Sequence, residues 1–288
     1  MATEAIVPLN VLTELTFLEP DIIFQSEKPY RLRYDPGDEI PRTNCKSQVQ
    51  SNILIHDIRG RESSFSLDNN GFEILTLDSK LGPEDFYDRE KVQAVYYKEL
   101  QQLLRDRFGP KRVEILEHGI RRRHAEFPIS IGGDYDHLQP TSIIHIGLSP
   151  WLNGEQNPLL TCLTCSSITI GSLRLTSSSI WKPLRGPLTD WPLSVCDARS
   201  VSIEQDCEAT DVVERTGFTE NYQVYFNPAQ HFCYLNRQLA SELVVFRQSD
   251  TKPGCTTAGS PHAGFRNPNT MPGEHPRESI ETRAFLYY

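Results

Sequence analysis

Short strands dominate this chain beyond Gly109, and no other feature limits its fold as strongly. Apolar or alternating runs of a few residues follow one another, separated by Gly, Pro, Asn and Asp. The candidate strands are Val113–Leu116, Ser142–Ile146, Ser167–Ile170, Ser179–Trp181, Leu193–Cys196, Tyr222–Phe226, Glu242–Arg247 and Ser279–Tyr287. Many short strands with little helix between them favour a sandwich or jelly roll over a doubly wound sheet. We therefore predict a mainly β fold.

The N-terminal part is less regular. From Pro20 to about Asn52, turn signals such as Asp35-Pro36-Gly37 predict an extended segment, so residues 1–52 are interpreted as a wrapping arm. Residues 53–288 are then one jelly-roll domain. It starts with a strand over Asn52–Ile58, and the pattern over Phe65–Phe72 predicts a hairpin.

One stretch, near residues 83–108, has helical periodicity. Pro83 fits the first helical position, and Gly109 fits the end of the helix. Apolar residues recur at helical spacing at Val92, Val95, Tyr96, Leu100, Leu103 and Leu104. We expect an amphipathic helix packed on the outside of a sheet.

Charge and motifs narrow the functional classes. The 288 residues carry a formal net charge of −9, which disfavours a nucleic-acid partner. No run approaches the roughly 20 apolar residues of a membrane span. Seven scattered cysteines and the lack of a signal-peptide pattern predict a cytoplasmic protein with reduced thiols. Cys162-x-x-Cys165 has no second ligand pair and does not predict zinc.

Histidines and arginines cluster at the ends of the predicted strands. His145, His231 and His262 are the histidines in question, and Arg277 and Arg283 belong to the segment Arg277–Arg283 near the start of the last strand. In a jelly roll such strand ends open into the mouth of the barrel, where a ligand can be held.

An ordered set of motifs carries a family resemblance. The motifs are Ile180-Trp181-Lys182-Pro183-Leu184, Pro192–Val201, His231-Phe232-Cys233-Tyr234, Pro261–Phe265 and Arg277–Arg283. From about His56 to the C-terminus the chain resembles the fungal AsaB and CmcJ-like family, which includes oxygenases of secondary metabolism. The resemblance implies a double-stranded β-helix (jelly roll) with flanking helices, of the iron(II) and 2-oxoglutarate oxygenase type.

The metal motif of that fold is altered here. Such enzymes hold iron with a His-x-Asp pair and a distant histidine. The pair falls on His145-Ile146-Gly147, so the carboxylate is missing. The distant histidine is His262 or His231, and the strand order favours His262. Arg277 or Arg283 would contact a carboxylate or enolate oxygen.

Loss of the carboxylate leads to the main functional prediction. We expect no cofactor and no metal, and a cyclase or isomerase of fungal secondary metabolism acting on a small-molecule polyketide or terpenoid. The chemistry would be dehydration to a quinone methide followed by hetero-Diels–Alder cycloaddition. The predicted catalytic residues are His145, His262, Lys182, Arg277 and Arg283, and the predicted substrate-binding residues are Trp181, Trp191, His231 and Arg199. Asp197 and Arg199 also fit a structural ion pair.

Two alternatives remain open. The first is an Fe(II)- and 2-oxoglutarate-dependent oxygenase that holds iron through His145 and His262, with water, a halide or a nearby acid such as Asp134 or Asp136 in place of the lost ligand. The second is a non-catalytic scaffold subunit. A homodimer is compatible with each of the three.

Overall fold

Two antiparallel-rich β-sheets form the body of the protein. A computed structural model describes residues 9–123, 136–137, 144–147, 174–252 and 259–288. In these residues the nine-stranded sheet has the spatial order β1 (Val11–Leu18), β3 (Ser47–Asp57), β12 (Phe232–Tyr234), β9 (Leu193–Cys196), β14 (His262–Gly264), β7 (His145–Gly147), β11 (Gly217–Val224), β10 (Cys207–Glu214) and β2 (Tyr30–Leu32). The six-stranded sheet has the order β4 (Phe72–Thr76), β13 (Glu242–Asp250), β8 (Leu175–Pro183), β15 (Glu278–Tyr287), β5 (Arg112–Arg122) and β6 (Asp136–His137).

The helices are short, apart from the one with a clear sequence signal. The α-helices are α1 (Leu67–Asn70), α2 (Arg89–Lys91), α3 (Tyr97–Phe108) and α5 (Ile203–Asp206), and the 3-10 turns are η1 (Ile22–Gln25), η2 (Glu62–Ser64), η3 (Pro83–Tyr87) and η7 (Ala198–Ser200). A π-helical turn, η4 (Val92–Tyr96), joins α2 to α3. The predicted helix near 83–108 is therefore irregular at its start, where the Asp88 side chain accepts hydrogen bonds from the N–H groups of Glu90 and Lys91. It ends at Gly109, whose φ of 68° is left-handed.

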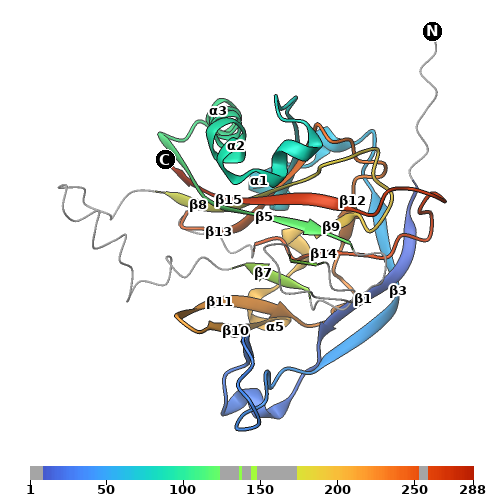
Figure 1. Cartoon of the computed structure of the whole chain (residues 1–288). Helices are drawn as coiled ribbons and strands as arrows, with labels where there is room; N and C mark the ends of the chain where they lie inside the picture. Colours follow the sequence, from blue (N-terminus) through green and yellow to red (C-terminus); the bar gives the residue numbers. More distant parts are fainter. Residues whose placement is uncertain (1–8, 124–135, 138–143, 148–173, 253–258) are drawn as a thin grey trace, which may run out of the picture.

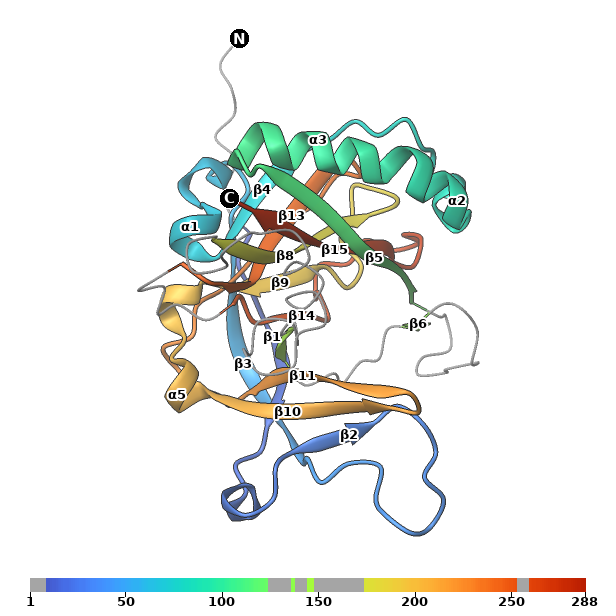
Figure 2. The ribbon, with the colours of Figure 1, turned by 90° about the vertical axis from the view of Figure 1, so that its left-hand side faces the viewer.

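Helices cover one face of the six-stranded sheet, and the nine-stranded sheet covers the other (Figures 1 and 2). Leu100 and Leu104 of α3 pack with Ile180 and Ile280 in the helix-side core. A second core, which contains Trp181, Val195 and Phe246, lies between the sheets. A third core contains Ile146 and covers the outer face of the nine-stranded sheet.

Strand alternation decides which side chains enter the space between the sheets. On β15, Ile280 belongs to the helix-side core, so Ser279 and Glu281 face the opposite way, toward the nine-stranded sheet. On β7, Ile146 belongs to the outer core, so His145 faces the six-stranded sheet. We call the volume between the two sheets the barrel interior.

Two predicted N-terminal elements differ from the structure. The hairpin predicted over Phe65–Phe72 is wrong: α1 forms there, because Ser66 caps it by accepting from the Asn69 N–H, and Gly71 ends it at a φ of 79°. Within the stretch interpreted as an arm, β1 pairs along β3, and β2 pairs with β10. Long strand pairing overrides the irregular local pattern of this segment. The division at residue 52 stays a prediction.

Most of the other predicted strands coincide with observed ones. The structure lengthens the predicted strand at Val113 to β5 and the one at Ser179 to β8. It adds β10, β12 and β14, which have weak sequence signals. The strand predicted over Ser167–Ile170 lies outside the described residues. No helix in the described ranges is long and apolar enough to cross a membrane.

Candidate functional site

His145 and His262 lie side by side in the barrel interior. The two residues are direct partners between the neighbouring strands β7 and β14. Their ring centroids are 4.9 Å apart. Cross-strand partners share a face of a sheet, so both imidazoles project from the nine-stranded sheet toward the six-stranded one. The structure thus brings together the two histidines that the sequence analysis favoured.

His262 has a fixed tautomer and a fixed ring position. Its Nδ1 lies 3.1 Å from the Ser260 carbonyl oxygen, which can only accept, so Nδ1 carries the proton and the Nε2 lone pair is available. The Phe246 ring packs against the imidazole with centroids 4.4 Å apart. Burial lowers the pKa of His262 and thereby favours the neutral ring. A neutral, oriented imidazole held by a backbone carbonyl is typical of a metal ligand.

Gly147 lies on the same face as His145 and has a polar neighbour. It pairs with Asn221 of β11, and His145 pairs with Gln223. The Asn221 Oδ1 atom accepts a hydrogen bond from Gln223 Nε2 at 3.2 Å. Two amides therefore lie beside the position at which the motif of the resembling family has its carboxylate.

A half-buried carboxylate faces the histidines from the opposite sheet. Glu281 of β15 accepts a hydrogen bond from the Ser179 hydroxyl at 2.9 Å. Ser179 in turn accepts from Gln248 Nε2 at 2.8 Å. Burial alone raises the pKa of Glu281, but the His262 ring when it is protonated, and the Arg121 and Arg283 charges in either case, act against burial and lower it. The two guanidinium groups thus favour the ionised form of the Glu281 carboxyl.

Arg277 places a buried guanidinium in the same interior. Its Nη1 donates to the Trp191 carbonyl at 2.5 Å, and its Cζ lies 5.5 Å from the centroid of the Trp181 ring. The Nε atom is buried and has no hydrogen-bond partner among the described residues. Burial, and then the Arg121 charge, lower the pKa of Arg277. A bound carboxylate would satisfy the free donor and offset both effects.

Two further arginines differ in their accessibility. Arg121 lies on the inner face of β5 and is the cross-strand partner of Ser279. Among the described residues, no carboxylate lies within 4 Å of its guanidinium. Arg283 is 47% exposed in its side chain and pairs with Glu117, with 3.0 Å between Nη1 and Oε1. Arg277 is thus the deep arginine of the two that the sequence left as alternatives.

Lys182 is not part of this arrangement. Side chains along β8 alternate between the two faces of the sheet, so Lys182 lies on the helix-side face with Ile180. Its Nζ lies 4.8 Å from the Phe86 ring centroid and 5.7 Å from that of Tyr96. The six-stranded sheet therefore separates it from His262, which corrects the expectation of a shared catalytic site.

The predicted substrate-binding residues are dispersed. Trp181 is buried in the core between the sheets, and the Trp191 carbonyl accepts from Arg277. His231 is exposed and stacks on His56, with centroids 4.1 Å apart, rather than on the central pair. Arg199 is 62% exposed in its side chain, and its Nη2 lies 2.6 Å from Asp197 Oδ2. Arg199 therefore forms the structural ion pair that the sequence analysis allowed.

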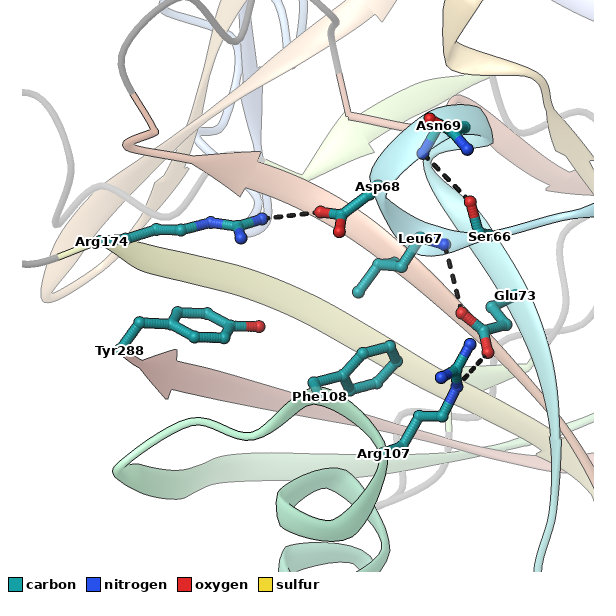
Figure 3. A pocket seen from close by; sticks show the side chains of 9 residues that line it. All are labelled: Ser66, Leu67, Asp68, Asn69, Glu73, Arg107, Phe108, Arg174 and Tyr288. Carbon is teal, nitrogen blue, oxygen red and sulfur yellow. Dashed lines mark hydrogen bonds and ion pairs between the residues drawn. The ribbon is translucent and has the colours of Figure 1, made fainter.

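A pocket of about 370 Å³ lies on the helix side, near the C-terminus, and does not contain the histidines. Figure 3 shows its charged side chains paired with one another. Arg174 contacts Asp68 at 2.9 Å, and Arg107 contacts Glu73 at 2.5 Å. Since these charges are satisfied internally, the pocket is a weaker candidate than the barrel interior.

The residues present fit an iron and 2-oxoglutarate site in part. Two oriented imidazoles fit two ligand positions, and the free Arg277 Nε fits a carboxylate of the cosubstrate. Within the described ranges, however, no three His, Cys, Asp or Glu side chains are placed to hold a metal ion together. The third protein ligand of the usual triad is therefore absent at Gly147. Asp134 lies outside the described residues, and the side chain of Asp136 is not described.

Comparison with known proteins defines the class. The relative named hydroxylase/desaturase efuI, from Hormonema carpetanum, is 28% identical over 265 residues, which cover 85% of this chain and 86% of that protein. The alpha-ketoglutarate-dependent dioxygenase tstK of Talaromyces stipitatus is 26% identical and covers 93% of this chain and 97% of its own length. The solved structure of the iron and alpha-ketoglutarate-dependent endoperoxidase NvfI superposes with a TM-score of 0.78 at 23% identity, over 96% of this chain and 98% of that one.

The fold is therefore the double-stranded β-helix of iron and 2-oxoglutarate oxygenases, as predicted. The profile of the family described as oxidoreductase/YMDC permease-like domain matches residues 15–287, and the chain belongs to that family. These comparisons overturn the prediction of a cofactor-free cyclase or isomerase, because the relatives named by cofactor depend on iron and 2-oxoglutarate. They support the oxygenase alternative instead.

Sequence reasoning missed the polar residues that complete the site. Glu281 and Arg121 stand on strands whose inner face cannot be told from their outer face by composition. Glu281 lies within the motif Arg277–Arg283. Because side chains alternate along a strand, its position next to the apolar Ile280 could have indicated that it faces the other side of the sheet. Asn221 and Gln223 became visible through their register opposite Gly147 and His145.

Proposed function

We propose that the protein is an Fe(II)- and 2-oxoglutarate-dependent oxygenase that acts on a small molecule of fungal secondary metabolism, with an altered metal triad. The observation that carries this proposal is the pair of adjacent imidazoles, one with its Nδ1 proton held by a backbone carbonyl. Relatives with this cofactor dependence support it.

His145 and His262 would hold the iron. Bound iron of this kind, together with 2-oxoglutarate, supplies dioxygen activation for substrate oxidation. Gly147 contributes no side chain, which leaves one more position for an exogenous ligand such as water or a halide. The Ser260 carbonyl and the Phe246 ring orient His262, so the imidazole does not have to be ordered when the metal binds.

Arg277 and Arg121 would hold the dianionic cosubstrate. Two guanidinium groups act on the carboxylate of Glu281, and the buried Asp190 near Arg277 is already paired with Arg123, so this part of the barrel interior has an excess of positive charge. Buried charges need partners, and 2-oxoglutarate brings two carboxylates. Trp181 beneath Arg277 and the apolar core around it exclude water from this end of the site.

Anaerobic calorimetric titration with Fe(II) and then 2-oxoglutarate tests the proposal. We expect stoichiometric Fe(II) binding by the wild type, and its loss in His145→Ala and His262→Ala because each removes one of two protein ligands. His118→Ala is a matched control, since His118 lies in the six-stranded sheet and its Nδ1 contacts the Tyr97 hydroxyl at 2.8 Å. It should bind Fe(II) like the wild type.

A substitution of Arg277 tests the binding of 2-oxoglutarate separately. Arg277→Met should weaken 2-oxoglutarate binding to the metal-loaded protein by roughly 10-fold or more, as expected for loss of a charge-assisted hydrogen bond. Arg283→Met should have a smaller effect, because Arg283 is exposed and already paired. A wild-type protein that binds neither Fe(II) nor 2-oxoglutarate would contradict the proposed function.

A further inference from the structure

The carboxylate missing from β7 has a counterpart across the barrel. We propose that Glu281 supplies the negative charge that Gly147 lacks, and that it balances a divalent cation held by His145 and His262 from the opposite sheet. This inference rests on the proposed function and concerns a residue of the same site.

Glu281 is placed for this role by strand register. It stands in the middle of β15, opposite Trp181 of β8 on one side and Gly119 of β5 on the other. Among the described residues, no atom outside the two chain neighbours lies within 4 Å of the point where a Cβ of Gly119 would be. The interior beside the Glu281 carboxylate therefore has room for a ligand.

The carboxylate is held on one side and open on the other. Ser179 directs its hydroxyl proton to Glu281 Oε1, since the Ser179 oxygen is already an acceptor for Gln248. No described residue donates a hydrogen bond to Oε2, and no cationic nitrogen of the described residues lies within the 4.0 Å of an ion pair. An ionised carboxylate in this position is compensated only by charges at longer range.

A chain of contacts links Glu281 to the histidine pair on the other sheet. The Phe246 ring contacts His262, and Phe246 is the cross-strand partner of Ser179, which holds Glu281. A cation on the Nε2 side of His262 would face this carboxylate.

In this proposal Glu281 offsets the charge of the cation without bonding to it, so it is not a third metal ligand. The described side chains offer no set of three metal donors at bonding geometry. A carboxylate beyond the ligands still raises metal affinity, because it offsets the cation's charge in a medium of low dielectric.

The test measures metal binding directly. Co(II) titration under anaerobic conditions, followed by calorimetry and by the visible absorption of the bound ion, needs no turnover. We expect Glu281→Gln to raise the Kd for Co(II) by roughly 10- to 100-fold, as is typical when an outer-shell partner is lost. Gln keeps the size of the side chain and an oxygen for Ser179, and circular dichroism checks that the variant is folded.

Two further variants separate charge from structure. Glu117→Gln removes a carboxylate that is 61% exposed on the neighbouring strand, and it should leave the Kd unchanged. Gly147→Asp combined with Glu281→Gln should recover tight binding, because the new carboxylate stands beside His145. If Glu281 balances charge, Gly147→Asp should tighten Co(II) binding much more in the Glu281→Gln protein than in the wild type, whereas a purely structural role predicts the same gain in both.

The outcomes are distinguishable. If the wild type binds Co(II) and Glu281→Gln binds it equally well, this inference is wrong while the proposed function stands. If the double variant stays as weak as Glu281→Gln, the charge-balance role is likewise overturned. If the wild type binds neither Co(II) nor Fe(II), both the inference and the proposed function fail.

Discussion

Lys182 shows that the surroundings of a single residue decide whether it belongs to a catalytic site or to the hydrophobic core. The side chain is 4% exposed and packs against Phe86 and Tyr96 under the helices. Burial lowers its pKa to about 8. In a motif between Trp181 and Pro183 it resembled a donor for a substrate oxygen, whereas the fold assigns it to the helix-side core.

This residue predicts a specific pH dependence of stability. The unfolded chain has an ordinary lysine pKa near 10.5, so between pH 8 and 10.5 it binds more protons than the folded protein, and stability rises with pH there. We expect Lys182→Met to be more stable than the wild type at pH 7, by about 3 kcal/mol at most. The difference should shrink as the pH approaches 10.

Urea unfolding of both proteins at pH 7, 8, 9 and 10 measures this difference. Other titrating groups occur in both proteins and cancel in the comparison. A stability difference that does not change with pH would show that Lys182 has the same pKa in the folded and unfolded protein, and would contradict the lowered pKa.

At the level of elements, the close packing of the segment before β14 against β13 and β7 sets the position of His262. Gly259 enters β14 from the end of β13, and its Cα is packed between strands. A Cβ at this position would lie 2.3 Å from the Gln248 carbonyl oxygen and 2.4 Å from Ile146 Cγ2. These contacts fix Ser260, whose carbonyl orients His262.

Gly259→Ala should therefore displace β14. We expect a loss of stability of about 1–3 kcal/mol, as for overpacking in a core, together with weaker Fe(II) binding. Gly217→Ala is the matched control, because no atom of the described residues beyond its two chain neighbours lies within 4 Å of its added Cβ. Thermal unfolding and the Fe(II) titration compare the two, and equal behaviour of the two variants would contradict the packing argument.

For the whole molecule, the helix layer and the six-stranded sheet share one hydrophobic core. Leu100 of α3 is fully buried and belongs to the same cluster as Ile180 and Ile280 of the central strands. The opposite faces of these strands carry Trp181 and Glu281 of the barrel interior. A substitution that weakens packing in the helix layer should therefore lower the free energy of unfolding of the whole fold.

Leu100→Ala should cost about 2–5 kcal/mol, through lost burial and the cavity left behind. Leu116→Ala, at a strand position that is 37% exposed, should cost much less. Urea unfolding followed by tryptophan fluorescence and by circular dichroism measures both. Coincident transitions are expected, and separate transitions for the two probes would mean that the layers unfold independently.

The sequence determined the strand-rich architecture, the helix before Gly109 and the His145-Ile146-Gly147 motif, because these depend on residues that are close along the chain. It also indicated His262, through the order of the neighbouring strands. Only the tertiary structure decided the faces: Lys182 went to the helices, His231 to the surface, and Glu281 and Arg121 to the barrel interior. The side-chain period of a strand is two, but which of its two faces is covered by helices depends on pairing between distant segments.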